Sequence, residues 1–403
     1  MQTTLRDDCG ITFARGYRAA ALNCGIRKSK PDLTLIVSDP PAAAAGVFTT
    51  NLFKAAPVCV SQAHLRSERI RAILVNSGNA NAATGAAGHD AALTCAAETA
   101  RRLGCAPTEV LIASTGIIGV PLPTEKIVAG LDTLVATAAP SGGDAAAQAI
   151  LTTDTFVKQR ACEVALRGGT VRLGGIAKGA GMIMPNMATM LAFITTDAAI
   201  ERQTLQRLLA RANALSFNRI TVDGDTSTND MVLCFATGAA GAPPLAADSR
   251  AFRTFRRALD QVCLALAKMI ARDGEGATKL AEVCVRGARS VREARRAAET
   301  VATSPLVKTT LFGEDINWGR IMAALGRSGA RFDPDRVAIR VDRVPVVQNG
   351  VSLGPRAEAA ANRRLRRREF ALTVTLHAGR AEARLWTTDL SEAYVRINAG
   401  YRS

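Results

Sequence analysis

An uncharged run near the midpoint of the chain limits the folds that are open to it. Residues 179–196 contain no Asp, Glu, Lys or Arg, and the run is long enough to suit a membrane helix. Gly179, Pro185 and Asn186 crowd its first half, however, and would break such a helix. From Thr189 onward the residues are β-branched, aromatic or aliphatic, which favours a buried strand. The pattern therefore predicts a loop that leads into a core strand, with a hydroxyl group at the junction.

The hydroxyl group of Thr189 has two interpretations. Held rigidly at the start of a strand, it could attack the peptide bond that precedes it. A Thr that opens a buried strand is far more often an ordinary strand former, because its shape suits a pleated surface. The stretch alone leaves both interpretations open.

Composition indicates a globular protein of substantial size. The chain has 403 residues, 48% of them hydrophobic and 21% charged, which allows two or three domains or one large α/β unit. The net charge of +16 invites a nucleic-acid interpretation. Only 4% of residues are aromatic, and no nucleic-acid motif accompanies the arginine runs at 286–296 and 363–368. We therefore expect no specific nucleic-acid function.

Cysteine and histidine usage disfavours several kinds of site. The nine cysteines are scattered and form no C-x-x-C pair, which is typical of reduced thiols in a cytoplasmic protein. The three histidines have no metal-ligand spacing, so we expect neither a metal site nor a histidine-centred triad. The N-terminus lacks the apolar core of a secretory signal, and we expect no membrane association.

Periodicity and turn residues predict alternating strands and helices, an α/β fold of layered sheets with covering helices. A break at Pro40-Pro41 is expected to end the first strand, and Asp90 to begin a helix that Gly104 closes. The strands are expected at 33–37, 70–75, 110–113, 337–341 and 370–376, and two amphipathic helices at 205–215 and 252–269.

Several polar segments follow these elements. The Asn-rich segment 76–81 is equally consistent with a binding loop and an ordinary turn, and Gly116 could expose an N–H group to an oxyanion. The acidic segment 223–230 misses the calcium-loop spacing, so we interpret it as a polar loop near an active centre. Glu275 lies between glycines and could meet a cationic group, and the tyrosines near the C-terminus predict that this end docks.

The central stretch resembles the self-cleavage segment of a known family. Lys178-Gly-Ala-Gly-Met-Ile183 and Pro185-Asn-Met-Ala-Thr-Met-Leu-Ala-Phe-Ile-Thr-Thr-Asp197 are similar to that segment in the ornithine acetyltransferases, the arginine-biosynthesis proteins also described as bifunctional glutamate N-acetyltransferases. Further segments resemble the family in its order along the whole chain: 49–51, 76–81, 114–119, 152–155, 223–230, 317–320 and 398–403.

The resemblance implies a self-cleaving acyltransferase of the N-terminal-nucleophile kind. Thr189 would attack the carbonyl carbon of Ala188, and hydrolysis of the resulting ester would leave an alpha chain of residues 1–188 and a beta chain of residues 189–403. It implies that the two fragments work as pairs, in a larger hetero-oligomer of them. The free α-amine of Thr189 would then serve as general base, since an α-amino group ordinarily has a pKa of about 7.7–8.0, close to neutral pH.

The resemblance also implies the reaction and its site residues. An acetyl group would pass from N-acetylornithine to the Thr189 hydroxyl and then to glutamate. Thr115 and Gly116 match the oxyanion-hole positions of the family. The substrate-binding positions match Thr155, Lys178, Thr189, Glu275, Asn398 and Ser403. Lys178 would pair with a carboxylate and Glu275 with an ammonium group. No cofactor is implied, and the sequence leaves open whether acetyl-CoA is also a donor.

Two alternatives remain open on the sequence. An N-terminal-nucleophile amidase or aminopeptidase would use the same acyl-enzyme and give the acyl group to water. A non-enzymatic binding protein, for nucleic acid in view of the charge, would show no cleavage.

Overall fold

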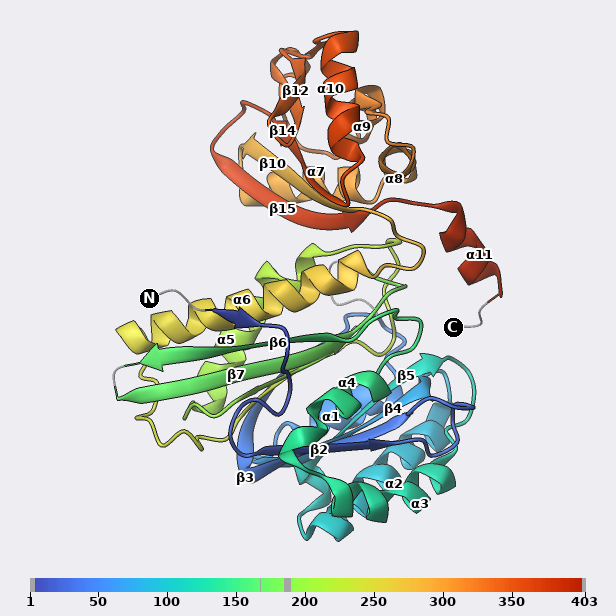
Figure 1. Ribbon diagram of the computed structural model, residues 1–403, viewed down its shortest axis with the longest axis vertical. Coiled ribbons are helices and arrows are strands. Elements are labelled where there is room, and N and C mark those ends of the chain that lie inside the picture. The colour runs from blue at the N-terminus through green and yellow to red at the C-terminus, as the bar shows by residue number, and fades with distance from the viewer. Residues whose placement is uncertain (1–3, 167, 185–189, 401–403) are drawn as a thin grey trace. The chain divides into compact units, whose positions relative to one another are not determined.

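The protein forms two compact units. The structure, a computed structural model, describes residues 4–166, 168–184 and 190–400. The first unit comprises residues 1–218, 225–270 and 402–403, and the second comprises 219–224 and 271–401. Each is a mixed α/β layered structure with its own sheet, so the predicted fold class is confirmed (Figure 1).

The sheet of the first unit has nine strands among the described residues. Its order is β1-β6-β7-β8-β9-β3-β4-β5, and β2 pairs with β3. The strands are β1 Leu5–Arg6, β2 Tyr17–Leu22, β3 Leu33–Phe48, β4 Ile70–Asn79, β5 Val110–Ile117, β6 Lys158–Leu166, β7 Gly169–Lys178, β8 Leu191–Thr196 and β9 Met231–Ala236. The helices are α1 Ala56–His64, α2 Gly85–Leu103, α3 Thr124–Thr137, α4 Gly143–Ala149, α5 Arg202–Leu215 and α6 Arg250–Arg272, of which residues 271–272 belong to the second unit.

Both faces of this sheet are buried, which explains its apolar strands. Along β3, Leu33 and Leu35 face one core with α2 and α3, whereas Ile36 faces another with α4. The side chains of successive strand residues point to opposite faces, so such strands read as continuous hydrophobic runs. Strand β8, the predicted core strand of the uncharged run, is buried at every residue and lies between β7 and β9.

The second unit has a six-stranded sheet among the described residues, in the order β13-β12-β11-β14-β10-β15. The strands are β10 Leu280–Ala288, β11 Ala338–Val341, β12 Val344–Gln348, β13 Val351–Ser352, β14 Glu369–Thr375 and β15 Ala381–Thr388. The helices are α7 Val291–Ala302, α8 Pro305–Phe312, α9 Trp318–Gly326, α10 Pro355–Leu365 and α11 Glu392–Gly400. One apolar core joins this sheet to α7, α8, α9 and α10.

The structure corrects two expected element boundaries. Strand β3 continues through Pro40-Pro41 as far as Phe48, and its pairing with β4 shifts register between Val37 and Ala42. Proline lacks a backbone N–H group, so it is tolerated where the ladder is interrupted. Helix α2 begins at Gly85, before Asp90, but it ends as predicted at Gly104, which is left-handed with φ 65°.

Candidate active site

The ends of the parallel strands β4 and β5 bring the predicted oxyanion residues to one buried edge. Thr115 pairs with Ser77 and Gly116 with Gly78, and Thr115 is buried. Gly116 has a φ of +136°, and a Cβ atom placed on it would lie 2.3 Å from the Gly78 carbonyl carbon. Only glycine therefore fits at this position.

A buried amide network holds this edge in place. Asn229 donates from Nδ2 to the carbonyl oxygens of Ala80 at 2.6 Å and Ser114 at 2.9 Å. Ser114 Oγ donates to Asn76 Oδ1 at 2.5 Å, and Asn76 Nδ2 donates to the Asn79 carbonyl at 2.9 Å. The polar side chains of Ser114, Asn76 and Asn229 around Thr115 are thus all hydrogen-bonded within the protein.

The network clarifies two polar segments whose roles were open. Asn76 Nδ2 and Asn81 Nδ2 both donate to backbone carbonyls, so these amides of segment 76–81 have a structural part. The end of the acidic segment lies beside Thr115, through the contact of Asn229 with Ser114. The interpretation of this segment as a loop near an active centre is consistent with that position.

A buried carboxylate between two lysines lies next to Thr115. Asp154 Oδ1 accepts from Lys158 Nζ at 2.7 Å, and its Oδ2 lies 4.0 Å from Lys178 Nζ. Lys178 Nζ also donates to Thr115 Oγ1 at 3.3 Å. The Gly179 amide adds a hydrogen bond of 2.7 Å to Asp154 Oδ1. The Asp154 and Lys158 side chains are fully buried and Lys178 nearly so.

The two lysines determine the ionisation of Asp154. Burial alone would raise the pKa of its carboxyl group, but the charges of Lys178 and Lys158 and the hydrogen bonds to the carboxylate hold it well below its usual value. Asp154 is therefore ionised at neutral pH and keeps both lysines in place.

The start of β8 is fastened by a second buried carboxyl group. Met190 N donates to Asp230 Oδ1 at 2.7 Å, and Met231 N donates to the Met190 carbonyl at 3.2 Å. Leu191 pairs with Lys178 across the sheet. Lys178 therefore links the start of β8 to Thr115. Ala188 and Thr189, the predicted cleavage site and nucleophile, lie outside the described residues, as does Ser403.

In the second unit, two predicted substrate-binding residues meet. Asn398 Nδ2 donates to Glu275 Oε2 at 2.9 Å. The loop that carries Glu275 is fastened by Asp389, whose carboxylate accepts from Thr278 N at 2.8 Å, Thr278 Oγ1 at 2.6 Å and Lys279 N at 3.0 Å. Ser391 Oγ donates to the Gly276 carbonyl at 2.6 Å. These contacts bring two of the predicted substrate-binding residues together within the second unit.

The C-terminal end attaches by polar contacts. The apolar side chains of α11 that suggested docking are exposed, at 63% for Val395 and 38% for Ile397. The segment joins the second unit through Asp389, Ser391 and Asn398. The docking of the whole C-terminal end stays a prediction, because α11 is largely exposed and residues 401–403 lie outside the described residues.

Thr155 is the last predicted site residue to locate, and a metal site and a membrane helix are two further features to look for. Thr155 follows Asp154 directly and is exposed. Within the described ranges, no three His, Cys, Asp or Glu side chains gather where they could hold a metal ion. No helix in that part of the chain combines the length and apolar character that crossing a bilayer requires.

Comparison with known proteins decides the family. The chain matches the ArgJ family over residues 18–403. It belongs to that family. It is 52% identical to the arginine biosynthesis bifunctional protein ArgJ of Geobacter sulfurreducens over 96% of this chain and 99% of that protein. The corresponding protein of Symbiobacterium thermophilum is 50% identical over 98% of each chain.

A solved structure is also similar to part of the chain in sequence. The crystal structure of the arginine biosynthesis bifunctional protein ArgJ from Bacillus halodurans is 42% identical, covers 51% of this chain and 97% of that one, and has a TM-score of 0.49. The predicted family is confirmed, and with it the prediction of an acetyltransferase enzyme of arginine biosynthesis. These relatives give no support to the amidase alternative.

Sequence reasoning missed the buried carboxyl groups of this ArgJ family member. Asp154 was noticeable as the one acid in a Thr-rich segment, and Asp230 as the last acid of segment 223–230. Nothing in their spacing indicated that Asp154 would lie between Lys158 and Lys178, because β6 and β7 form a hairpin that brings these lysines together. No sequence feature around Asp389 indicated that its carboxylate would hold the loop that carries Glu275.

Proposed function

We propose that the protein cleaves itself before Thr189 and then moves an acetyl group from N-acetylornithine to glutamate through an acetyl-Thr189 intermediate. One observation carries the proposal: Lys178 pairs with Leu191 at the start of β8 and reaches Thr115 Oγ1 at 3.3 Å. The described start of β8, which follows the proposed nucleophile in the chain, is thereby joined through Lys178 to the proposed oxyanion residue Thr115. Membership of the ArgJ family supports the same activity.

Cleavage begins with attack of Thr189 Oγ on the carbonyl carbon of Ala188. The bond from that carbon to the Thr189 nitrogen breaks, the nitrogen takes up a proton, and the hydroxyl proton is released. Water then hydrolyses the ester, which leaves a carboxylate on residue 188 and a free hydroxyl on Thr189. The fragments are residues 1–188 and 189–403.

Transfer repeats this acyl chemistry on a substrate. The α-amine of Thr189 takes the proton from its own hydroxyl group, and Oγ attacks the acetyl carbonyl of N-acetylornithine. Ornithine leaves with that proton as the bond from its nitrogen to the acetyl carbon breaks. The amine of glutamate then attacks the acetyl ester, the bond from the acetyl carbon to Thr189 Oγ breaks, and a proton from the attacking amine passes through the Thr189 amine to Oγ. Backbone N–H groups at Thr115 and Gly116 stabilise the oxyanion in each step.

The proposed binding residues have separate chemical parts. We assign Glu275 and Asn398, which are hydrogen-bonded to each other, to the substrate's ammonium end together with Ser403. Lys178 and Thr155 belong to the Thr115 side. Lys178 is buried against Asp154 and Thr115, so its positive charge is held in one place. There it would attract the carboxylate of the substrate and the negative charge that develops on the acyl oxygen.

The assembly and location follow from the same proposal. The fragments remain paired and form a larger hetero-oligomer, and the enzyme works in the cytoplasm, which suits its nine free cysteines. Acetyl-CoA is a second acetyl donor to test.

The decisive experiment follows cleavage and transfer together. The purified protein is expected to run as two bands under denaturing conditions, with masses that place the break before Thr189, and Thr189→Ala is expected to remain one intact chain without transfer activity. Ornithine release is then measured with and without glutamate, and with acetyl-CoA in place of acetylornithine. An intact wild-type chain would refute the mechanism, and glutamate-independent release would indicate a hydrolase.

A further inference from the structure

A pocket lined by arginines lies in the second unit, among residues that have no part in the proposed reaction. Its volume is about 680 Å³, and its lining includes Arg289, Arg331, Phe332, Arg336 and His377. Pockets of roughly 300–1,000 Å³ are of the size that binds small molecules. All of its lining residues belong to the second unit, so the pocket is formed within that unit.

The pocket lies at the carboxyl ends of two parallel strands. Strands β10 and β14 are parallel neighbours in the sheet. Arg289 follows the last residue of β10 directly, and His377 lies two residues after the end of β14. Ligands of α/β proteins commonly bind outside the carboxyl ends of such strands, because the loops that follow them meet at the same edge. The pocket therefore occupies a place in the sheet where a ligand site is expected.

The arginines of the pocket lack acidic partners. Among the described residues, Arg289, Arg331 and Arg336 make no ion pair and no side-chain hydrogen bond. Elsewhere in the same unit an exposed arginine does pair, since Arg384 lies 3.5 Å from Glu282. Three like charges around one pocket repel one another, and an anion bound between them would offset that repulsion. The arrangement therefore favours a negatively charged ligand.

The balance of charge in the lining indicates how negative the ligand is. Of the described residues that line the pocket, Asp333 is the only acid. Its Oδ1 accepts from Asp335 N at 3.1 Å, at the start of the short helical turn Pro334–Arg336. Three guanidinium groups against one carboxylate leave an excess of two positive charges. A phosphate monoester carries about −1.5 to −2 at neutral pH, which matches this excess.

Part of the lining is apolar and held in place. Ala330, Phe332 and Ala378 are partly buried and pack against the core of the second unit. The turn after β14 is fastened by Ala378 N and Gly379 N, which donate to the Gly287 carbonyl at 2.7 Å and 2.8 Å. An aromatic ring beside guanidinium groups suits a ligand that joins a phosphate group to a flat base, as a nucleotide does.

We propose that this pocket binds a small molecule that carries a phosphate group, with its three arginines around the phosphate and Phe332 against the rest of the ligand. Guanidinium groups match the geometry of phosphate oxygens and donate two parallel hydrogen bonds to them. The inference goes beyond the proposed acetyl transfer and does not rest on it. A nucleotide and free inorganic phosphate share this chemistry, and the experiment separates them.

The test measures the binding of three probes to the purified full-length protein by isothermal titration calorimetry at low ionic strength. The probes are AMP, inorganic phosphate and adenosine. We expect AMP and phosphate to bind saturably at one site per chain and to displace each other, and adenosine, which lacks the phosphate group, not to bind. Tighter binding of AMP than of phosphate assigns the pocket to a nucleotide, and equal affinities assign it to free phosphate.

A pair of matched variants tests the position of the site. Arg331→Gln with Arg336→Gln is compared with Arg363→Gln with Arg364→Gln. Both double variants remove two positive charges from exposed side chains of the second unit, but Arg363 and Arg364 lie on α10 and do not line the pocket. The first is expected to weaken phosphate and AMP binding by about tenfold or more, and the second by less than about twofold.

The remaining variant, Phe332→Leu, tests the apolar wall. If the ligand is a nucleotide, we expect weaker AMP binding and unchanged phosphate binding, because only the base contacts this side chain. Loss of phosphate binding in a folded Phe332→Leu would contradict the placement of the phosphate group among the arginines.

Three outcomes overturn the inference. One is the absence of saturable binding of both AMP and phosphate up to about 1 mM. Another is adenosine binding as tight as that of AMP. The third is an equal loss of affinity in the two double variants, which would show that the anions are attracted by the basic surface in general. Each result is independent of self-cleavage, since binding is measured directly on the chain, whether cleaved or intact.

Discussion

At the scale of single residues, the site depends on buried charges and one glycine. Asp154 lies between Lys158 and Lys178 with its side chain fully buried. Removing one partner of a buried ionic cluster leaves the others uncompensated, which costs far more than losing an exposed ion pair. The lysines are thus stabilised as a set, and Thr115 is held by one of them.

Asp154→Asn is expected to lower the free energy of unfolding by about 3–5 kcal/mol at neutral pH, because two buried lysines lose their counter-charge. The folded-state pKa of Asp154 lies below its usual value, so its stabilisation is present above the ordinary Asp pKa of about 4 and is lost as the pH falls through the folded-state value. Urea unfolding from pH 7 downward should show the gap between wild type and variant narrowing in acid.

The control for this prediction is Asp132→Asn. Asp132 pairs with Arg102 at 2.7 Å, but its side chain is 77% exposed. Exposed pairs contribute about 0–1 kcal/mol, so this variant should unfold nearly as wild type does. Equal losses in the two variants would contradict the special role of burial at Asp154.

Gly116→Ala is expected to reduce acetyl transfer about a hundredfold or more, because the new Cβ would force the backbone of β5 away from Gly78 and displace the proposed oxyanion donors. Gly119→Ala is the matched control. Gly119 also has a positive φ, of +81°, but nothing lies within 4 Å of its Cβ position, so only strain of about 1 kcal/mol is expected. The steady-state kcat and the Tm of both variants are measured. Equal kcat values in the two variants would contradict the claim that the close contact between Gly116 and Gly78 matters for transfer.

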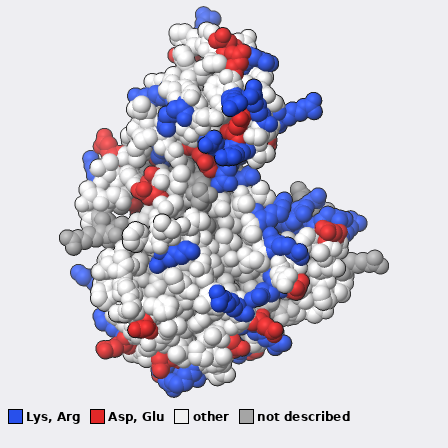
Figure 2. All heavy atoms as spheres, turned by 180° about the vertical axis from the view of Figure 1, so that it is seen from behind, with Lys and Arg blue, Asp and Glu red and all other residues white. Residues whose placement is uncertain are grey.

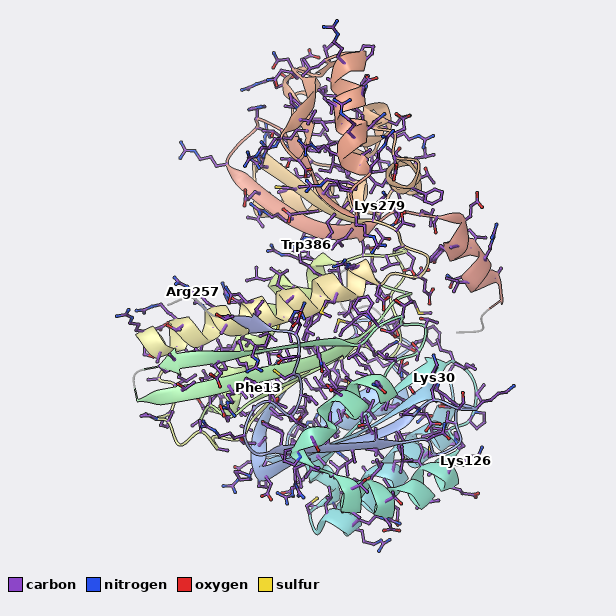
Figure 3. All side chains as sticks on the ribbon, viewed as in Figure 1. Phe13, Lys30, Lys126, Arg257, Lys279 and Trp386 are labelled. Carbon is purple, nitrogen blue, oxygen red and sulfur yellow. The ribbon has the colours of Figure 1, made fainter. Side chains whose placement is uncertain are left out.

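At the scale of elements, short polar contacts hold the loop that carries Glu275 in the second unit. Asp389 fastens residues 278 and 279, and Lys279, labelled in Figure 3, donates to Glu314 Oε1 at 2.6 Å. A Cβ on Gly276 would lie 2.4 Å from Tyr394 N, so the loop and the C-terminal segment are in close backbone contact. The position of Glu275 therefore depends on contacts made by Asp389 and by the backbone of Tyr394.

Asp389→Ala is expected to raise the KM for N-acetylornithine by about tenfold while kcat falls less, because Glu275 loses its fixed position but the acyl chemistry does not involve it. Asp342→Ala serves as control, since Asp342 also accepts a backbone amide, from Ala371 at 2.9 Å, in the same unit. A loss of stability with unchanged KM in both variants would show that Asp389 has a structural part only.

The ends of helices and strands show which boundaries the local sequence can predict. Gly104 ends α2 as predicted because its left-handed conformation is a local property. Pro40-Pro41 does not end β3, because the sheet places the prolines at a shift in register. The apolar residues of α11 were expected to be covered, but Val395 and Ile397 are exposed. Periodicity shows that a helix has an apolar face and does not show what covers that face.

At the scale of the whole molecule, the proposed cleavage does not follow the compact units. The break would fall between β7 and β8, which are antiparallel neighbours from Leu173↔Thr196 to Lys178↔Leu191. Strand β9 of the second fragment pairs in turn with β3 of the first. Residues 189–403 thus supply two central strands to a sheet whose other strands belong to residues 1–188.

The fragments are therefore expected to stay associated after cleavage. On size-exclusion chromatography under native conditions both should elute together, and they should separate only in denaturant, because parting them exposes the buried strands β8 and β9. Separation of folded fragments in dilute buffer would contradict the interleaved sheet.

The surplus of positive charge predicts a property of the whole surface. The net charge is +16, and Figure 2 shows Lys and Arg side chains gathered on part of one face. Helix α6 contributes Arg250, Arg253 and Arg257 in its first turns. We expect retention on a polyanion column without sequence preference and release by about 0.3 M salt. Arg253→Gln with Arg257→Gln should elute earlier, and salt-resistant, sequence-dependent binding would contradict the expectation.

The sequence by itself determined the family and the buried core strand β8, because these depend on motif order and local residue pattern. Only the tertiary structure decided which buried charges meet. Asp154 joins Lys178, and Asp230 holds Met190, through strands that are distant in sequence and adjacent in the sheet. Burial raises the pKa of both carboxyl groups, but the charges of Lys158 and Lys178 and the hydrogen bonds to Asp154 outweigh it there, so the pKa of Asp154 is lowered whereas that of Asp230 is raised.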